Sequence, residues 1–286
     1  MSSALLPTPL VSVAWLAEHL GAPWLRVVDA TMYLPSAARD ARAEYTAAHI
    51  AGAVFCDIGY VSDDAALYPH TLPSAELFAA RVGALGIGSE HAVVVYDSSG
   101  QNFSGPRLWW LLRTFGHTQV AILDGGLRAW TAAGHAVTSD VSAVTPAHFT
   151  AALAPARVRD IDAMRANVAS HAEQVVDARS PGRFQAIEAE PRAGVRGGHI
   201  PDSVNVHYAK LVREDGTMRT ADELRRIMAD AQLDLTRPIV ASCGSGVTAC
   251  AVVLALDVLG VSNTAVYDGS WTEWGSAPDT PVATGP

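Results

Sequence analysis

The stretch IVASCGSGVTA, residues 239–249, places a cysteine between an apolar run and the start of a helical pattern. The apolar residues 239–241 suit a strand buried on both faces, and Gly244 and Gly246 allow a tight turn after Cys243. Backbone N–H groups of such a turn can converge on one point and, together with the dipole of the following helix, stabilise an anion there. The stretch therefore predicts a reactive thiolate at the carboxyl end of a buried strand.

Three other interpretations of this cysteine are weaker. A free cysteine often serves as a small buried hydrophobe, which we expect for Cys56 and Cys250, but the strand end and the flanking glycines favour reactivity for Cys243. A cysteine phosphatase needs an arginine at the sixth position after its cysteine to clamp phosphate, and this chain has Ala249 there. A papain-like protease has a different architecture, and its local signatures are absent.

The chain repeats itself in order. The separation between matching residues runs from 144 (Asp124 to Asp268) to 150 (His49 to His199), as small loop insertions would produce. In this pairing Asp97 matches Cys243. The matching segments are VVDA 27–30 with VVDA 175–178, AHIAGA 48–53 with GHIPDS 198–203, VVVYD 93–97 with PIVASC 238–243, and LDGGLRAW 123–130 with YDGSWTEW 267–274.

The repeat predicts two copies of one α/β domain, at residues 1–140 and 158–286. The segment 141–157 between them is rich in Ala, Thr, Ser and Pro and is expected to be a linker. Each half alternates short apolar runs with helical patterns, the clearest at residues 106–115 and 247–259, which is typical of a mostly parallel sheet with helices on both faces. Ligands of such sheets bind beyond the carboxyl ends of the strands, where Cys243 falls.

Composition excludes several classes of protein. The chain has 286 residues, 49% of them hydrophobic, which excludes a disordered chain, and its net charge of −9 argues against nucleic acid or anionic lipid as a partner. Three dispersed cysteines without a C-x-x-C pair predict neither a disulfide framework nor a metal site. The most apolar segment, 247–261, contains Asp257 and is too short for a membrane span, and residues 1–20 lack a secretory pattern. We therefore expect a cytoplasmic protein.

The loop CGSGVTA, residues 243–249, resembles the active-site loop of the two-domain rhodanese-like sulfurtransferases, in the form typical of those that use 3-mercaptopyruvate. The resemblance implies tandem rhodanese-like domains, the first non-catalytic, and transfer of sulfur through a Cys243 persulfide without metal or cofactor. The implied partners are a small-molecule sulfur donor and an acceptor, either cyanide, a small thiol or a thioredoxin-like protein. Further similar segments are WWLLRTFGH 109–117, GRF 182–184, RGGHIP 196–201 and WTEW 271–274.

Site residues follow from the same resemblance. Arg183 and Arg192 match positions that bind the substrate carboxylate; the alternative is ordinary ion pairing with Glu188 or Glu190. Ser245 is a hydroxyl able to donate to the donor's carbonyl or to relay a proton, or it serves as a turn residue. The remaining loop residues expected to contact substrate are Gly244, Gly246, Val247 and Thr248.

In the family the serine is thought to act with a histidine and an aspartate of the first domain. His70 matches the histidine, but Gly59 stands where the aspartate is expected, so His70 could instead be a hydrogen-bonding residue between domains. His49 and His199 occur in both halves and are expected to be structural. Trp271 and Trp274 are expected to pack in the core or between domains.

Two further functions stay open. Thiosulfate is the alternative donor, although its double charge should favour basic residues at the neutral Gly244-Ser245 pair. A non-catalytic binding protein is the second alternative, which the intact glycine loop after Cys243 disfavours.

Overall fold

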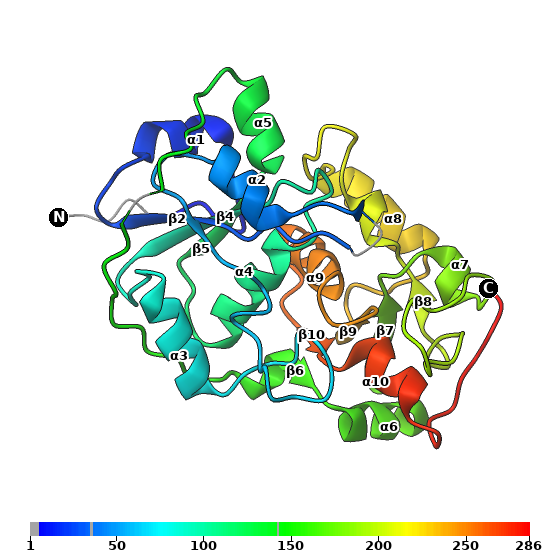
Figure 1. Cartoon of the computed structure of the whole chain (residues 1–286). Coiled ribbons are helices and arrows are strands. Elements are labelled where there is room, and N and C mark those ends of the chain that lie inside the picture. The colour runs from blue at the N-terminus through cyan, green and yellow to red at the C-terminus, as the bar shows by residue number, and fades with distance from the viewer. Residues whose placement is uncertain (1–5, 35–36, 142) are drawn as a thin grey trace. The chain divides into compact units, whose positions relative to one another are not determined.

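The computed structural model describes residues 6–34, 37–141 and 143–286. The chain forms two compact units, each built on a five-stranded parallel sheet (Figure 1). The strand order is β1-β5-β4-β2-β3 in the first sheet and β6-β10-β9-β7-β8 in the second. When each strand is matched to the one five places later in the chain, the two orders are identical. The predicted α/β fold and its duplication are therefore confirmed.

The first sheet has helices on both faces: α1, α2 and α5 lie on one side and α3 and α4 on the other (Figure 1). The long buried strand at its centre consists of five apolar or aromatic residues, as expected for a parallel strand covered on both faces. The strands are β1 (Leu10–Val11), β2 (Leu25–Asp29), β3 (Val54–Phe55), β4 (Ala92–Tyr96) and β5 (Val120–Leu123). The helices are α1 (Val13–His19), α2 (Ala41–Ala47), α3 (Ala75–Ala84), α4 (Gly105–Thr114) and α5 (Gly126–Ala132).

The second sheet repeats this pattern, and its five helices follow the same order along the chain. Its strands are β6 (Val158–Arg159), β7 (Gln174–Asp177), β8 (Val204–Asn205), β9 (Ile239–Ser242) and β10 (Thr264–Tyr267). Its helices are α6 (Ile161–Ser170), α7 (Pro181–Phe184), α8 (Ala221–Asp230), α9 (Ala249–Val258) and α10 (Ser270–Ser276), with 3-10 turns η2 (Pro155–Arg157) and η3 (Tyr208–Leu211). The α9 helix begins at Ala249, two residues later than predicted, because residues 244–248 form the turn.

The core of the second unit explains the two tryptophans of the C-terminal motif. Trp271 and Trp274 are fully buried and pack with Tyr267 of β10. Their indole N–H groups donate to the carbonyl oxygens of Arg196 and Pro281, each at 2.8 Å, which satisfies the polar end of each buried ring. Core packing within this unit, one of the two expected roles, is what the structure describes.

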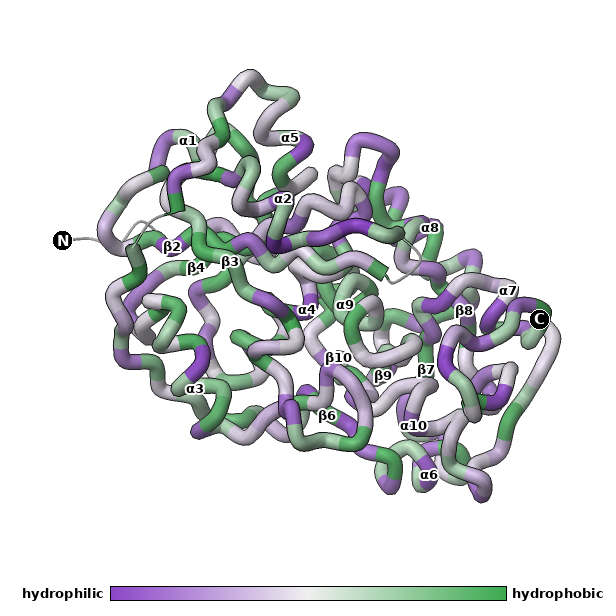
Figure 2. The backbone as a smooth tube through the Cα atoms, viewed as in Figure 1, coloured by the Kyte–Doolittle hydropathy of each residue, from purple (hydrophilic) through white to green (hydrophobic). Residues whose placement is uncertain are grey.

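The most apolar helix is α9, which appears green in Figure 2 and has ten residues. Within the described ranges, no helix combines the length and the hydrophobicity that crossing a membrane requires.

The two units exchange short segments of chain. The first unit contains residues up to Asp64, Leu72–Leu153 and the segment Val212–Met218, whereas the second contains Ala65–Thr71 together with Ala154–Leu211 and the chain from Arg219. We call Ala65–Thr71 and Val212–Met218 the exchanged arms. The expected boundaries at 140 and 158 stay a prediction, which treats each half of the chain as one domain and does not address these arms.

Candidate active site

Cys243 directly follows β9, the central strand of the second sheet, and its side chain is buried. β9 lies between β7 and β10, so the cysteine is at the carboxyl edge of the sheet, as expected for a site in a parallel fold. Gly246 has a φ of +75°, in the left-handed region that glycine adopts without a steric penalty. The chain thus turns between β9 and α9 around the position of the cysteine.

The first residues of α10 fix the backbone of this turn. The Cys243 N–H donates to Ser270 Oγ at 3.1 Å, and the Cys243 carbonyl accepts from the Trp271 N–H at 2.9 Å. The Gly244 carbonyl accepts from both the N–H of Thr272, at 2.9 Å, and its Oγ1, at 2.5 Å. Both peptide groups around the cysteine are therefore anchored before any substrate binds.

Arg183 lies over the turn. A side chain at Gly244 would come within 3.2 Å of Arg183 Nη2, so the glycine leaves room for the guanidinium. Nη2 also lies 2.6 Å from Glu190 Oε2, and the Glu190 side chain is only 4% exposed. Of the two alternatives expected for this residue, substrate contact and ion pairing, Arg183 makes the ion pair, which holds it beside the cysteine loop.

Glu190 also accepts from Arg179 Nη1 at 2.7 Å, and Arg179 in turn pairs with Asp177 at the end of β7. These three side chains are almost completely buried. A buried carboxylate that is shared by two arginines restricts the rotation of both, because breaking either pair leaves an uncompensated charge. The strand end at Asp177 is thereby connected to the guanidinium over the loop.

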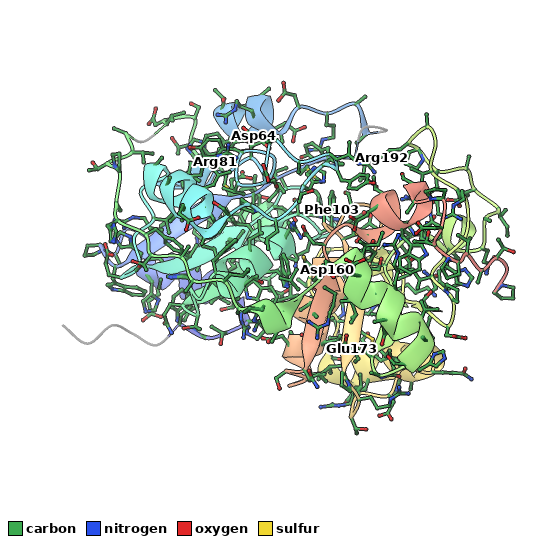
Figure 3. The ribbon with its side chains drawn as sticks, turned by 90° about the horizontal axis from the view of Figure 1, so that it is seen from below. Asp64, Arg81, Phe103, Asp160, Glu173 and Arg192 are labelled. Carbon is green, nitrogen blue, oxygen red and sulfur yellow. The ribbon has the colours of Figure 1, made fainter. Side chains whose placement is uncertain are left out.

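Arg192 is connected to the same loop through α10. Its Nη1 donates to Thr272 Oγ1 at 3.2 Å, and Figure 3 shows the labelled side chain beside this helix. The structure therefore brings both predicted arginines close to the turn after Cys243. Arg183 lies over Gly244, and Arg192 bonds to Thr272 of α10, the helix that anchors the turn.

The exchanged arm Ala65–Thr71 brings His70 to the loop. His70 Nδ1 lies 3.0 Å from Ser245 Oγ, within one compact unit. Gly59, where the resemblance called for an aspartate, belongs to the first unit, and its N–H donates to Asp57 Oδ1 at 2.8 Å. The serine and the histidine thus form the predicted pair, and Gly59 supplies no carboxylate.

The other residues of the loop have different surroundings. Val247 is buried, and Thr248 precedes α9 without a side-chain hydrogen bond to that helix. Cys250 is buried in α9, with its Sγ 3.3 Å from the Gly246 carbonyl oxygen.

Burial, reinforced by Asp57 and Asp29, raises the pKa of the Cys56 thiol well above its usual value. Within the described ranges, no group of three or more His, Cys, Asp or Glu side chains could hold a metal ion.

The matching loop of the first unit carries Asp97 at the cysteine position. Its Oδ2 accepts from the N–H groups of Ser104 and Gly105 at 3.1 and 3.0 Å, and its Oδ1 accepts from the Ser99 N–H at 3.0 Å. The loop and the start of α4 therefore surround a negative group at the end of the central strand, as the helix dipole favours. The site in this unit is filled by its own carboxylate, which cannot accept sulfur.

The paired histidines are structural, as expected. His49 stacks on Tyr45 and its Nδ1 lies 2.7 Å from the Tyr45 carbonyl oxygen. His199 stacks on Phe184 and its Nδ1 lies 2.9 Å from the Phe184 carbonyl oxygen. Each imidazole thus stacks on an aromatic ring and bonds to the carbonyl oxygen of the same residue. These contacts order the segment before β3 at His49 and the segment before β8 at His199.

Sequence reasoning missed two residues that contact the turn. Ser270 and Thr272 stood inside the repeated motif YDGSWTEW, but nothing in the local pattern indicated that α10 lies against Cys243. The available signal was the repeat itself, which has Gly126 and Arg128 at these two positions in the first half. At these aligned positions the two copies differ, and that difference is the signal that could have singled out Ser270 and Thr272.

Known proteins are similar over nearly the whole chain. Human 3-mercaptopyruvate sulfurtransferase is 44% identical over 279 residues, which cover 96% of this chain and 94% of the relative. A mitochondrial thiosulfate/3-mercaptopyruvate sulfurtransferase of Arabidopsis thaliana is 39% identical, covering 98% of this chain and 79% of the relative. Thiosulfate sulfurtransferase of Cricetulus griseus is 42% identical, covering 96% and 95%.

Solved structures are also similar to this chain over nearly its whole length. SseA from Escherichia coli, a 3-mercaptopyruvate sulfotransferase with the rhodanese fold, superposes with a TM-score of 0.84 at 39% identity, covering 94% of this chain and 99% of that one. Tum1 of Saccharomyces cerevisiae superposes with a TM-score of 0.88 at 30% identity, covering 99% of both chains. The model of the rhodanese-like domain matches residues 12–133 and again 160–277. The chain therefore belongs to the rhodanese-like family and carries the domain twice, with Cys243 at the strand end of the second copy and Asp97 in the first.

Proposed function

We propose that the protein transfers sulfur from 3-mercaptopyruvate to a thiol or to cyanide through a persulfide on Cys243. The observation that carries the proposal is the position of two arginines beside an uncharged cysteine loop: Arg183 lies over Gly244, and Arg192 binds Thr272 of the helix that anchors it. The names of the human and Escherichia coli relatives support the same donor.

In the first step the Cys243 thiolate attacks the sulfur of the donor. A sulfur–sulfur bond forms and the carbon–sulfur bond breaks, so its electron pair leaves as the enolate of pyruvate, which takes up a proton. The Ser245 hydroxyl, 3.0 Å from His70, is placed to donate to the developing enolate oxygen. In our proposal His70 orients this hydroxyl and exchanges its proton.

In the second step an acceptor thiolate or cyanide attacks the outer sulfur of the persulfide. The new bond forms as the sulfur–sulfur bond breaks, and Cys243 leaves as the thiolate with which the cycle began. The turn of Gly244 and Gly246 serves both steps, because its N–H groups and the α9 dipole favour an anion at the strand end. The Asp97 loop supports this role, since its N–H groups bind a carboxylate at the matching position.

The substrate carboxylate and carbonyl are assigned to Arg183 and Arg192. A guanidinium offers a planar set of N–H donors that matches a carboxylate, and both side chains are held in place by protein contacts. Gly244, Gly246, Val247 and Thr248 form the wall of the turn and are proposed to contact the donor. No metal or cofactor takes part in these steps.

Thiosulfate remains the second candidate donor, because relatives with about the same identity carry its name. Its transfer would use Cys243 in the same way and release sulfite. The neutral Gly244-Ser245 pair supports the 2-oxo acid instead. A comparison of kcat/KM for the two donors, with cyanide as a common acceptor, decides between them. We expect the larger value with 3-mercaptopyruvate, and a tenfold larger value with thiosulfate would reverse the assignment.

A cytoplasmic location is also a proposal. Three free, buried cysteines support a reducing compartment, in which a small thiol or a thioredoxin-like protein is available as acceptor. One relative is named mitochondrial, so the test is to follow the tagged full chain by fractionation. Recovery in the cytosolic fraction is expected, and recovery in an organelle would contradict it.

A further inference from the structure

The Thr272 hydroxyl makes two contacts in opposite directions. It donates to the Gly244 carbonyl oxygen at 2.5 Å and accepts from Arg192 Nη1 at 3.2 Å. A threonine hydroxyl has a single hydrogen, so the donation to Gly244 turns a lone pair toward the guanidinium. Thr272 is only 6% exposed, and water therefore competes little for either bond. One atom thus links a substrate-binding arginine to the peptide that follows the nucleophile.

The first unit shows what this position looks like without the nucleophile. Arg128 stands where the second unit has Thr272, and its guanidinium donates to the carbonyl oxygen of Glu214. The backbone bond before it is kept in both copies: the Leu127 N–H donates to the Asp97 carbonyl at 3.3 Å, as the Trp271 N–H does to Cys243. The packing of helix against loop therefore does not need the hydroxyl, which occurs only in the copy that has the cysteine.

The contact to Arg192 also leaves that arginine able to bind substrate. A guanidinium has five N–H donors, and the hydrogen bond to Thr272 uses one of them. A long side chain held at one nitrogen loses less conformational freedom when its remaining donors bind a carboxylate. The same hydroxyl fixes Gly244, so the carboxylate site and the attacking sulfur are held at a set distance.

We propose that Thr272 is a positioning residue that couples Arg192 to the Cys243 loop and thereby sets the affinity for a 2-oxo acid donor. This inference rests on the proposed function, because it assigns Arg192 to the donor's carboxylate. It predicts an effect on KM for 3-mercaptopyruvate that is larger than the effect on kcat.

The test compares Thr272→Val, which keeps the shape and removes the hydroxyl, with Thr272→Ser, which keeps the hydroxyl. The valine variant should raise KM for 3-mercaptopyruvate about tenfold, as expected when a hydrogen bond to a charged group is lost, and should change kcat less than threefold. The serine variant should stay within twofold of wild type in both constants.

Thr280→Val is the matched control. Thr280 is also buried, and its hydroxyl also donates to a backbone carbonyl oxygen, in this case that of Trp274. The same hydroxyl also accepts from an arginine, Arg196. It should lower the melting temperature about as much as Thr272→Val and leave KM unchanged. Equal KM values for the two valine variants would overturn the inference.

A double-mutant cycle with Arg192→Ala isolates the coupling. Once Arg192 is removed, Thr272→Val should raise KM no further, and additive effects would contradict the coupling. Persulfide formation by the wild-type protein, monitored by mass spectrometry, distinguishes a failure of the Thr272 inference from a failure of the proposed function. If wild type takes sulfur from 3-mercaptopyruvate but Thr272→Val behaves like wild type, only this inference is wrong. If wild type takes no sulfur, the proposed function is wrong and this inference with it.

Discussion

At the residue scale, the Arg183–Glu190 pair leaves room for the substrate contact that we propose for Arg183. Glu190 is almost fully buried and bonds to both Arg179 and Arg183, whereas the Arg183 side chain is 23% exposed. The carboxylate therefore orients a guanidinium that still reaches the surface beside Gly244. The sequence indicates an ion pair and a substrate contact as alternatives for Arg183. It does not show whether the two are compatible, because that depends on which face of the guanidinium meets the carboxylate.

Arg183→Ala should lower kcat/KM for 3-mercaptopyruvate about tenfold more than it lowers kcat/KM for thiosulfate, because only the former donor has a carboxylate. Steady-state kinetics with both donors measure the difference. Arg165→Ala is the control, since Arg165 of α6 makes exposed ion pairs with Asp162 and Asp279. Equal losses with the two donors after Arg183→Ala would remove the carboxylate role.

His117 allows a prediction about stability and pH. Burial lowers the pKa of its imidazole below the usual value, so the folded state binds a proton less readily than the unfolded chain does. As the pH falls through about 6.5, the ordinary histidine pKa, the unfolded chain therefore takes up more of this proton than the folded chain. The free energy of unfolding should therefore decrease from pH 7.5 to pH 5.5. Urea titration should show a smaller decrease for His117→Gln, and an unchanged pH dependence in that variant would contradict the assignment.

At the scale of elements, the turn between β9 and α9 shows what a local pattern can and cannot predict. The strand, the turn and the helix follow from an apolar run, two glycines and a second apolar run, and all three are present. The start of α9 was predicted two residues early because Val247 is apolar, although it packs in the core from the turn. The contact of α10 with Cys243 left no local signal, since it joins segments separated by the whole of α9 and β10.

Gly246→Ala tests whether the turn itself is catalytic. A side chain at a φ of +75° costs about 1–2 kcal/mol or shifts the backbone, and a shift here would distort the turn that follows Cys243. We expect a loss of sulfur transfer of about a hundredfold with a modest loss of stability. Gly260→Ala is the control, with a φ of +79° and open space around it. It should cost about the same stability and keep full activity; a similar activity loss in both variants would contradict the role of the turn.

At the scale of the whole molecule, the duplication is the feature that the sequence predicted best and the exchanged arms the one it missed. Four matching segments, spaced almost evenly, identify two copies and align Asp97 with Cys243. The two arms occupy matching positions of the repeat, and each contacts a segment that follows a strand of the unit it joins. His70 lies within hydrogen-bond distance of Ser245, and the Met218 N–H donates to the Asp124 side chain. Which unit a segment packs on depends on contacts distant in sequence, which repetition alone does not show.

Through the arm Ala65–Thr71, a residue from the first half of the chain, His70, lies beside Ser245 in the second unit. His70→Ala should therefore lower kcat with 3-mercaptopyruvate, by at least about tenfold if the histidine assists proton transfer through Ser245. His49→Gln serves as a control for a buried structural histidine of the same half. It should lower stability more than His70→Ala does and kcat less, and the reverse order would contradict the assignment of His70.

The central claim is that Cys243 carries the transferred sulfur. The most direct measurement is the mass of the intact protein after incubation with 3-mercaptopyruvate and removal of excess donor. We expect a gain of one sulfur atom in the wild-type protein and in Cys250→Ser, and no gain in Cys243→Ser. A wild-type protein without added sulfur, or a Cys243→Ser variant that still gains it, would show that Cys243 does not carry the transferred sulfur.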